Sequence, residues 1–146
     1  MPFINFMNIT RALSDENRVR ILMALRSHEF CVCQITAFLD LSPSTTSKHL
    51  SVLKQARLIE ARKVGKWVYY SLAGAKGNAD SPDGSDTALD AIRFVSRAIG
   101  DSPTVRRDEK RISQIMEDEK ICFGVDDNLV SDEFHSLAVH SLESAE

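Results

Sequence analysis

The stretch that most constrains the fold of this chain runs from Cys31 to Leu58 and has the pattern of two helices joined by a tight turn. Apolar residues at helical spacing give the first helix a buried side, and the run Leu41-Ser42-Pro43 then interrupts it. Ser42 is a good N-cap because its hydroxyl can accept a hydrogen bond from a free backbone N–H. Pro43 suits the first helical position, where no hydrogen bond is lost. The stretch therefore predicts a helix-turn-helix unit.

The second of these helices has two different faces. Thr46, Leu50 and Leu53 recur at helical spacing and predict the side that packs on the core. The opposite side carries short polar and basic side chains, which suit phosphates and base edges better than a core. The predicted DNA contacts on this helix are Ser44, Thr45, Ser47, Lys48 and His49.

A β-hairpin is predicted directly after the helical unit. Residues 58–63 and 67–72 are rich in β-forming side chains and flank Gly65, which can supply the positive φ of a tight turn. We expect a winged helix-turn-helix, mainly α with a small β-hairpin (α+β), that places one helix in the major groove of double-stranded DNA. The cations predicted to contact the DNA backbone from the hairpin are Arg62, Lys63 and Lys66.

The distribution of charge agrees with this assignment, although the net charge of −3 alone does not. Residues 41–70 hold six Lys and Arg against one Glu, a net charge of +5. Residues 101–146 hold five cations against twelve acids, a net charge of −7. The middle of the chain can therefore bind a polyanion, and the last third cannot do so through its net charge.

The chain divides into a core and an extension. Residues 1–99 are predicted to form the DNA-binding and dimerisation domain, with a flexible linker at 73–86 that is rich in Gly, Asp and Ser. Residues 100–146 are predicted to be an acidic C-terminal extension, a charged helix at about 104–122 followed by a weakly patterned tail. The apolar stripe of that helix is thin, which favours packing against another part of the assembly.

Other classes of protein are disfavoured by what the sequence lacks. No apolar run approaches the roughly 20 residues that cross a bilayer, and no secretion signal is recognisable, so we expect a cytoplasmic protein without a membrane partner. Three cysteines do not make a disulfide framework. A thiol oxidoreductase that uses Cys31 and Cys33 is disfavoured, because the βαβ context, a phosphate-binding loop and a general-base constellation are missing from the sequence. We therefore expect neither an enzyme nor an organic cofactor.

Four motifs, in order, resemble the ArsR/SmtB family. Residues 29–35, EFCVCQI, resemble the family's metal box ELCVCDL, and residues 42–50 resemble its recognition helix. Residues 65–70 resemble its wing strand, and residues 12–18 resemble the first turn of its second helix. The resemblance covers residues 9–72 well and 87–99 loosely.

The resemblance implies a homodimeric transcriptional repressor whose first and last core helices form the dimer interface, here near residues 3–13 and 87–99. Both segments are more apolar than a monomer needs. A twofold dimer places two recognition helices one helical turn apart on a near-palindromic operator. The metal box implies soft-metal sensing by Cys31 and Cys33, and the most similar branch of the family senses arsenite or antimonite, As(III) or Sb(III).

This chain departs from the arsenite-sensing pattern at the third ligand. Thr36 and Ala37 stand in the region where that pattern has a third cysteine. A third thiolate could be absent, replaced by water or an added thiol, or supplied by Cys122. The alternatives left open are a sensor of another soft metal such as cadmium or lead, or a repressor with a thiol redox or reactive-sulfur switch. The family's zinc-type site looks missing, because residues 87–99 contain Asp90 but no His.

The spacing of the cysteines also suggests a mechanism. If residues 31–40 are helical, Cys31 and Cys33 lie roughly 200° apart around the axis. Both sulfurs could not then hold one ion. We therefore expect that ion binding unwinds the first turn of this helix and so opposes operator binding.

Overall fold

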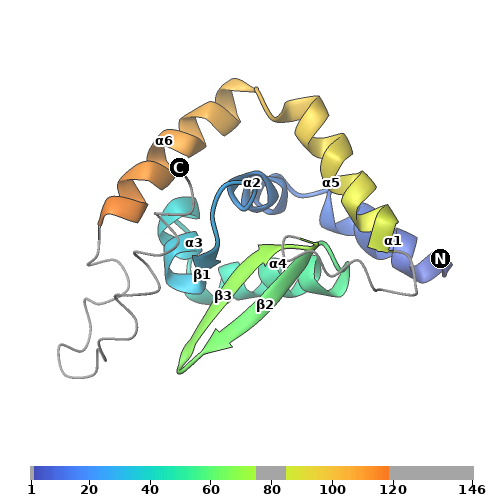
Figure 1. The fold of residues 1–146 in the computed structure, drawn as a ribbon, viewed down its shortest axis with the longest axis horizontal. Coiled ribbons are helices and arrows are strands. Elements are labelled where there is room, and N and C mark those ends of the chain that lie inside the picture. The colour runs from blue at the N-terminus through green and yellow to red at the C-terminus, as the bar shows by residue number, and fades with distance from the viewer. Residues whose placement is uncertain (1, 75–84, 119–146) are drawn as a thin grey trace.

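The computed structural model describes residues 2–74 and 85–118. It confirms the mainly helical winged helix-turn-helix fold (Figure 1). Most of the predicted linker at 73–86 and the tail from residue 119, including Cys122, lie outside the described residues. The elements are, in chain order, α1 (Phe3–Ala12), α2 (Glu16–Ala24), β1 (Phe30–Cys31), α3 (Val32–Leu39), α4 (Pro43–Gln55), β2 (Ile59–Val64), β3 (Trp67–Leu72), α5 (Ser85–Ile99) and α6 (Pro103–Glu117).

The reading unit, the helix-turn-helix formed by α3 and α4, has helix ends that are set by capping residues. Ser42 caps α4 by accepting from the Thr45 N–H, and Pro43 occupies the first helical position, as predicted. Asp40 adopts a left-handed conformation with φ of 54°, which ends α3 and turns the chain toward α4. The two helices are thereby held as one helix-turn-helix.

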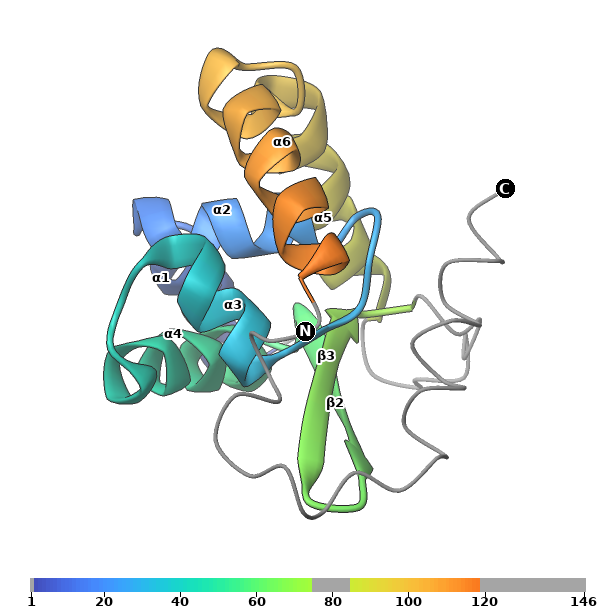
Figure 2. The same ribbon diagram turned by 90° about the vertical axis from the view of Figure 1, so that its left-hand side faces the viewer.

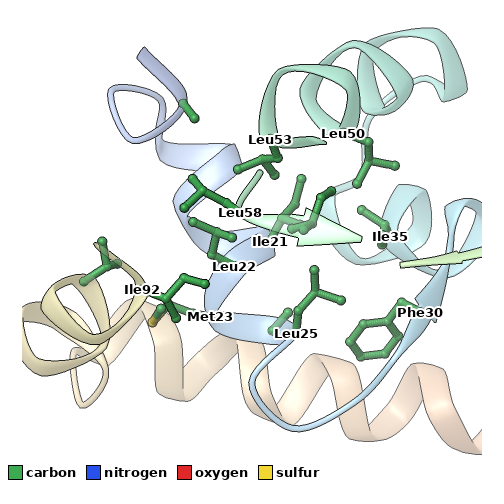
Figure 3. Packing of buried hydrophobic residues seen from close by; sticks show 14 of the residues in the cluster. Ile21, Leu22, Met23, Leu25, Phe30, Ile35, Leu50, Leu53, Leu58 and Ile92 are labelled. Carbon is green, nitrogen blue, oxygen red and sulfur yellow. The ribbon is translucent and has the colours of Figure 1, made fainter. Parts of the chain in front are cut away.

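The hydrophobic core lies between this unit and α2. Leu22, Leu53 and Leu58 are fully buried and meet at its centre (Figure 3). Thr46 is also buried, as its spacing predicts, and its hydroxyl donates to the Ser42 carbonyl at 3.1 Å. That bond satisfies the polar group that burial would otherwise leave unpaired.

A three-stranded antiparallel sheet in the order β1-β3-β2 forms the wing, and its β2–β3 hairpin extends away from the helices (Figure 2). Gly65 has a φ of 59°, which allows the tight turn between β2 and β3 that the sequence predicts. Strand β1 is only two residues long, and the sequence analysis did not anticipate it. It pairs Phe30 with Tyr70 and Cys31 with Tyr69, and so attaches the segment before α3 to the wing.

Helix α6 packs on α2 and α3 of its own chain (Figure 1). Val105, Ile112 and Ile115 are buried in the main hydrophobic cluster. Asp108, only 7% exposed, accepts from both Nε and Nη2 of Arg20 at 2.9 Å. The thin apolar stripe of α6 therefore packs against α2 and α3 of the same chain.

Apolar side chains remain exposed on α1 and α5. Phe3 is 80% exposed and Phe94 is 67% exposed, and Ile4, Phe6 and Met7 of α1 are also largely open to solvent. Such a group of large exposed apolar residues is typical of an interaction surface. Among the described residues, no helix is both long and apolar enough to cross a membrane.

Candidate nucleic-acid interface and thiol site

The N-terminus of α4 presents a cluster of hydroxyls. Ser42 Oγ donates to Thr45 Oγ1 at 2.9 Å, lies 3.2 Å from Ser44 Oγ, and accepts from the Thr45 N–H at 3.2 Å. Ser42 and Ser44 are exposed. Because the start of a helix carries partial positive charge, this end of α4 suits a DNA phosphate.

The outer face of α4 holds most of the side chains predicted to contact DNA. Ser44, Ser47 and Lys48 are exposed, whereas Thr45 is partly buried. This places four of the five predicted residues on or beside a polar, basic surface, and their contact with DNA stays a prediction.

His49, the fifth predicted contact, turns partly toward α2. Its Nδ1 lies 3.2 Å from Nη1 of Arg18, whose guanidinium also donates to the Ala12 and Arg11 carbonyls at 3.0 and 2.9 Å. Because a guanidinium can only donate, Nδ1 is the acceptor in a hydrogen bond between the two side chains. Arg18 therefore orients His49, and sequence reasoning did not single Arg18 out.

The three cations predicted on the wing divide into two groups. Lys63 and Lys66 are exposed and suit contact with a phosphate backbone. Arg62 is instead paired with Glu29, to which its Nε donates at 3.2 Å, and its guanidinium carbon lies 5.7 Å from the Tyr69 ring centroid. Glu29, which lies two residues before Cys31, was not expected to hold a wing cation.

The two cysteines of the predicted metal box lie side by side, with their sulfurs 2.6 Å apart. The expectation that they point apart around one helix is wrong. Cys31 is the N-cap of α3, with an extended backbone at φ −83° and ψ 166°, and Cys33 is in the first turn. An N-cap side chain folds back over the second and third helical residues, and here the second is Cys33. The pair therefore meets without any unwinding of α3.

A capping box holds Cys31 in this position. Its N–H donates to Gln34 Oε1 at 3.0 Å, while its sulfur faces the Gln34 N–H. Cys31 is 2% exposed, and this burial raises the pKa of its thiol, although the N–H groups of Gln34 and Cys33 act in the opposite direction. Gln34 Nε2 also lies 3.8 Å from the sulfur of Met116, which ties the box to α6.

Cys31 and Cys33 supply part of the donor set that a soft ion requires. Two adjacent sulfurs are the ligand type that soft ions prefer. Within residues 2–74 and 85–118, however, no group of three or more His, Cys, Asp or Glu side chains could hold a metal ion. The described residues thus supply two cysteine sulfurs, and a third protein ligand would have to come from elsewhere in the chain.

One rung of the sheet connects the thiol box to the wing. Cys31 of β1 pairs with Tyr69 of β3, and Tyr69 pairs with Arg62 of β2. Burial, followed by the nearby Cys31, raises the pKa of Tyr69 to about 12, and Arg62 partly opposes the shift. Paired residues of neighbouring strands project to the same face of the sheet. The sulfur of Cys31, the ring of Tyr69 and the guanidinium of Arg62 therefore lie in a row on one face.

Comparison with known proteins agrees with this geometry. Residues 15–61 match the model of a family of bacterial regulatory proteins, the arsR family. The chain is 45% identical to the cadmium resistance transcriptional regulatory protein CadC of Listeria innocua over 45% of this chain and 56% of that protein. It is 38% identical to the arsenical resistance operon repressor of Escherichia coli K12 over 50% of this chain and 63% of that protein.

A third relative is covered more fully. The chain is 38% identical to the HTH-type transcriptional regulator YbzH of Bacillus subtilis 168, over 42% of this chain and 77% of that protein. By contrast, the chain spans only about half the length of the cadmium regulator. The relatives named for a metal or metalloid are therefore matched over part of their length.

Two solved structures share the fold. HlyU from Vibrio cholerae N16961 has a TM-score of 0.52 and 25% identity, and covers 66% of this chain and 92% of its own. A homodimeric winged helix-turn-helix DNA-binding domain from Mycobacterium bovis has a TM-score of 0.53 and 24% identity, and covers 68% of this chain and 82% of its own. The second likeness concerns the fold alone.

Proposed function

Because the chain belongs to the arsR family of bacterial regulatory proteins, we propose that it is a metalloid-responsive transcriptional repressor. It binds operator DNA in the cytoplasm as a homodimer and releases it when arsenite or antimonite binds Cys31 and Cys33. Proteins of this family are transcriptional regulators, and the chain is not an enzyme. The names of its relatives support a metal or metalloid inducer, and they are compatible with either arsenic or cadmium.

The observation that carries the proposal is the position of the two sulfurs. They meet where β1 ends and α3 begins, at 2.6 Å from each other. Through β1 this point is attached to the wing, and through α3 it is attached to the turn that positions α4. A soft ion held there lies against both elements that read DNA.

The mechanism follows from the three contacts of Cys31. Its sulfur faces the first turn of α3, its N–H is held by Gln34, and its backbone pairs with Tyr69. Ligation directs the sulfur toward the ion and away from the cap, so Cys31 cannot keep all three contacts unchanged. Ion and operator then favour different arrangements of the same residues, and each lowers the affinity for the other.

Operator binding is proposed for the exposed side of α4 and the wing tip. The contacts are Ser44, Thr45, Ser47, Lys48 and His49 from α4, with Lys63 and Lys66 from the wing. The exposed apolar residues of α1 and of α5, such as Phe3 and Phe94, support the dimer because association would bury them. Cadmium and lead are the alternative inducers.

Cys122 is proposed as the third thiolate. The described helix α6 ends at Glu117, only a few residues before Cys122, and Met116 near that end contacts Gln34 of the thiol box. This contact supports the assignment because it brings the end of α6 beside the two cysteines. Water or an added thiol would fill the third position if Cys122 does not.

The test is a titration of the full chain against operator DNA selected from a random double-stranded pool. Fluorescence anisotropy should show binding that weakens steeply with salt, followed by release on addition of arsenite or antimonite. Zinc should have little effect, and cadmium or lead should act only if the alternative is correct. Failure of all five ions to release the DNA would reject metal sensing.

A redox switch remains the second candidate because the two sulfurs are adjacent. Oxidation would then release DNA without any ion. Against it, the thiolate is the form that oxidants attack, and burial of Cys31 raises its pKa and disfavours that form. Release by peroxide with no response to arsenite under reducing conditions would favour this candidate.

A further inference from the structure

Arg62 stands apart from the other cations of the wing. Lys63 and Lys66 are exposed, whereas Arg62 is turned back toward the body of the protein and is 40% exposed. Its guanidinium is bonded to Glu29 and lies over the Tyr69 ring. A phosphate contact would have to compete with both interactions.

Glu29 is equally unusual because of where it lies in the chain. It comes two residues before Cys31 and directly before β1, and its side chain is 21% exposed. Arg62 is on β2, the strand farthest from β1 in the sheet. The ion pair therefore spans the whole sheet, from the segment that carries the thiol to the outer strand of the wing.

We propose that Arg62 is a positioning residue that couples the thiol box to the wing, and not a contact to DNA. This inference rests on the proposed function and assigns the regulation of that site. When Cys31 shifts on ligation, Glu29 shifts with it, and the ion pair moves β2 and the wing tip accordingly. The rung from Cys31 through Tyr69 to Arg62 carries the same displacement through backbone pairing.

The size of the effect is bounded by the exposure of the pair. Because both side chains retain contact with water, the pair is weaker than a buried one. The backbone pairing of β1 with β3 does not involve the ion pair, so we expect it to persist when the ion pair is removed. Loss of the pair should therefore reduce the release of DNA without abolishing it.

The experiment compares full-length Arg62→Ala with Lys63→Ala, its exposed neighbour on the same strand. The quantity measured is the ratio of operator affinities without and with arsenite. Arg62→Ala should lower this ratio about threefold to fivefold, while the affinity of the DNA-free protein for arsenite, followed by thiolate absorption, stays within about twofold. Lys63→Ala should weaken operator binding equally in both states, leave the ratio unchanged, and reduce the salt slope by about 1.

Two further variants separate coupling from simple loss of structure. Glu29→Gln should lower the ratio as Arg62→Ala does, and the double variant should lower it no further. The charge-swapped pair, Glu29→Arg with Arg62→Glu, should restore part of the ratio. An Arg62→Ala protein that behaves like Lys63→Ala would overturn the inference and leave the proposed function standing. A wild-type chain that no ion releases would overturn both.

Discussion

Helices α3 and α4 both begin at an N-cap residue with an extended backbone, but one cap is buried and the other is exposed. Cys31 and Ser42 are both N-caps with extended backbones, and each is followed by a helix that packs on the common core. Ser42 is exposed and offers a hydroxyl to solvent, whereas Cys31 is buried and offers a thiol beside Cys33. One helix start suits a phosphate and the other suits a soft ion.

The difference shows how a cap can be a control point. A cap is a small interaction, but it fixes the direction in which the chain enters a helix. At α4 the entry is held by the Ser42 cap and lies at the end of the helix that is proposed to contact DNA. At the start of α3, Cys31 also belongs to β1, and Gln34 contacts Met116 of α6. A change at Cys31 therefore affects α3, β1 and α6 together.

Removal of one thiol should have the largest effect. Cys31→Ser keeps a side chain that caps well, so α3 should persist and operator affinity should stay within about threefold. A hydroxyl is a poor ligand for a soft ion, and affinity for arsenite should fall by more than about a hundredfold, which is beyond the loss typical for outer-shell residues. Thiolate absorption measures ion binding, and anisotropy measures release.

Cys33→Ser is the matched variant, because it removes the neighbouring sulfur and leaves the cap unchanged. It should lose ion binding to a similar degree while operator binding persists. Release of DNA by arsenite that survives both substitutions would contradict the assignment of the site. Loss of operator binding in Cys31→Ser but not in Cys33→Ser would indicate that the cap itself requires sulfur.

The buried start of α3 depends on α6, and breaking the anchor of α6 should have the next largest effect. Asp108→Ala leaves Arg20 without its carboxylate beneath the helix and should lower the free energy of unfolding by about 2–3 kcal/mol. Chemical denaturation measures the change. Amide hydrogen exchange should quicken in α6 and at the start of α3, and should be unaffected in α4.

Glu109→Ala is the control for that variant. Glu109 is the next residue on α6, its side chain is 54% exposed, and it reaches Arg26 only at 3.6 Å. Its loss should change the free energy of unfolding by less than about 0.5 kcal/mol. Equal effects of the two substitutions would mean that α6 is not anchored through Asp108.

The comparison also explains what the sequence could predict. Ser42, Pro43 and Gly65 act locally, so the turn, the start of α4 and the hairpin were predictable from neighbouring residues. The pair of Glu29 with Arg62 joins residues far apart in the chain and has no local pattern. Cys31 is an intermediate case. Gln34 at the third helical position is part of a capping-box pattern, but a cysteine in place of Ser or Thr conceals it.

Loss of the exposed cap should have the smallest effect of the three. Ser42→Ala removes the acceptor for the Thr45 N–H and one member of the hydroxyl cluster at the N-terminus of α4, the end proposed to contact DNA. The free energy of unfolding should fall by about 1 kcal/mol, and Ser42→Gly should cost less because glycine is tolerated as a cap. Operator binding should weaken in both the ion-free and the ion-bound protein, since Ser42 makes no contact with the thiol box. The ratio of the two affinities is therefore expected to match that of the wild type, and a changed ratio would show that the two caps are coupled through the turn at Asp40.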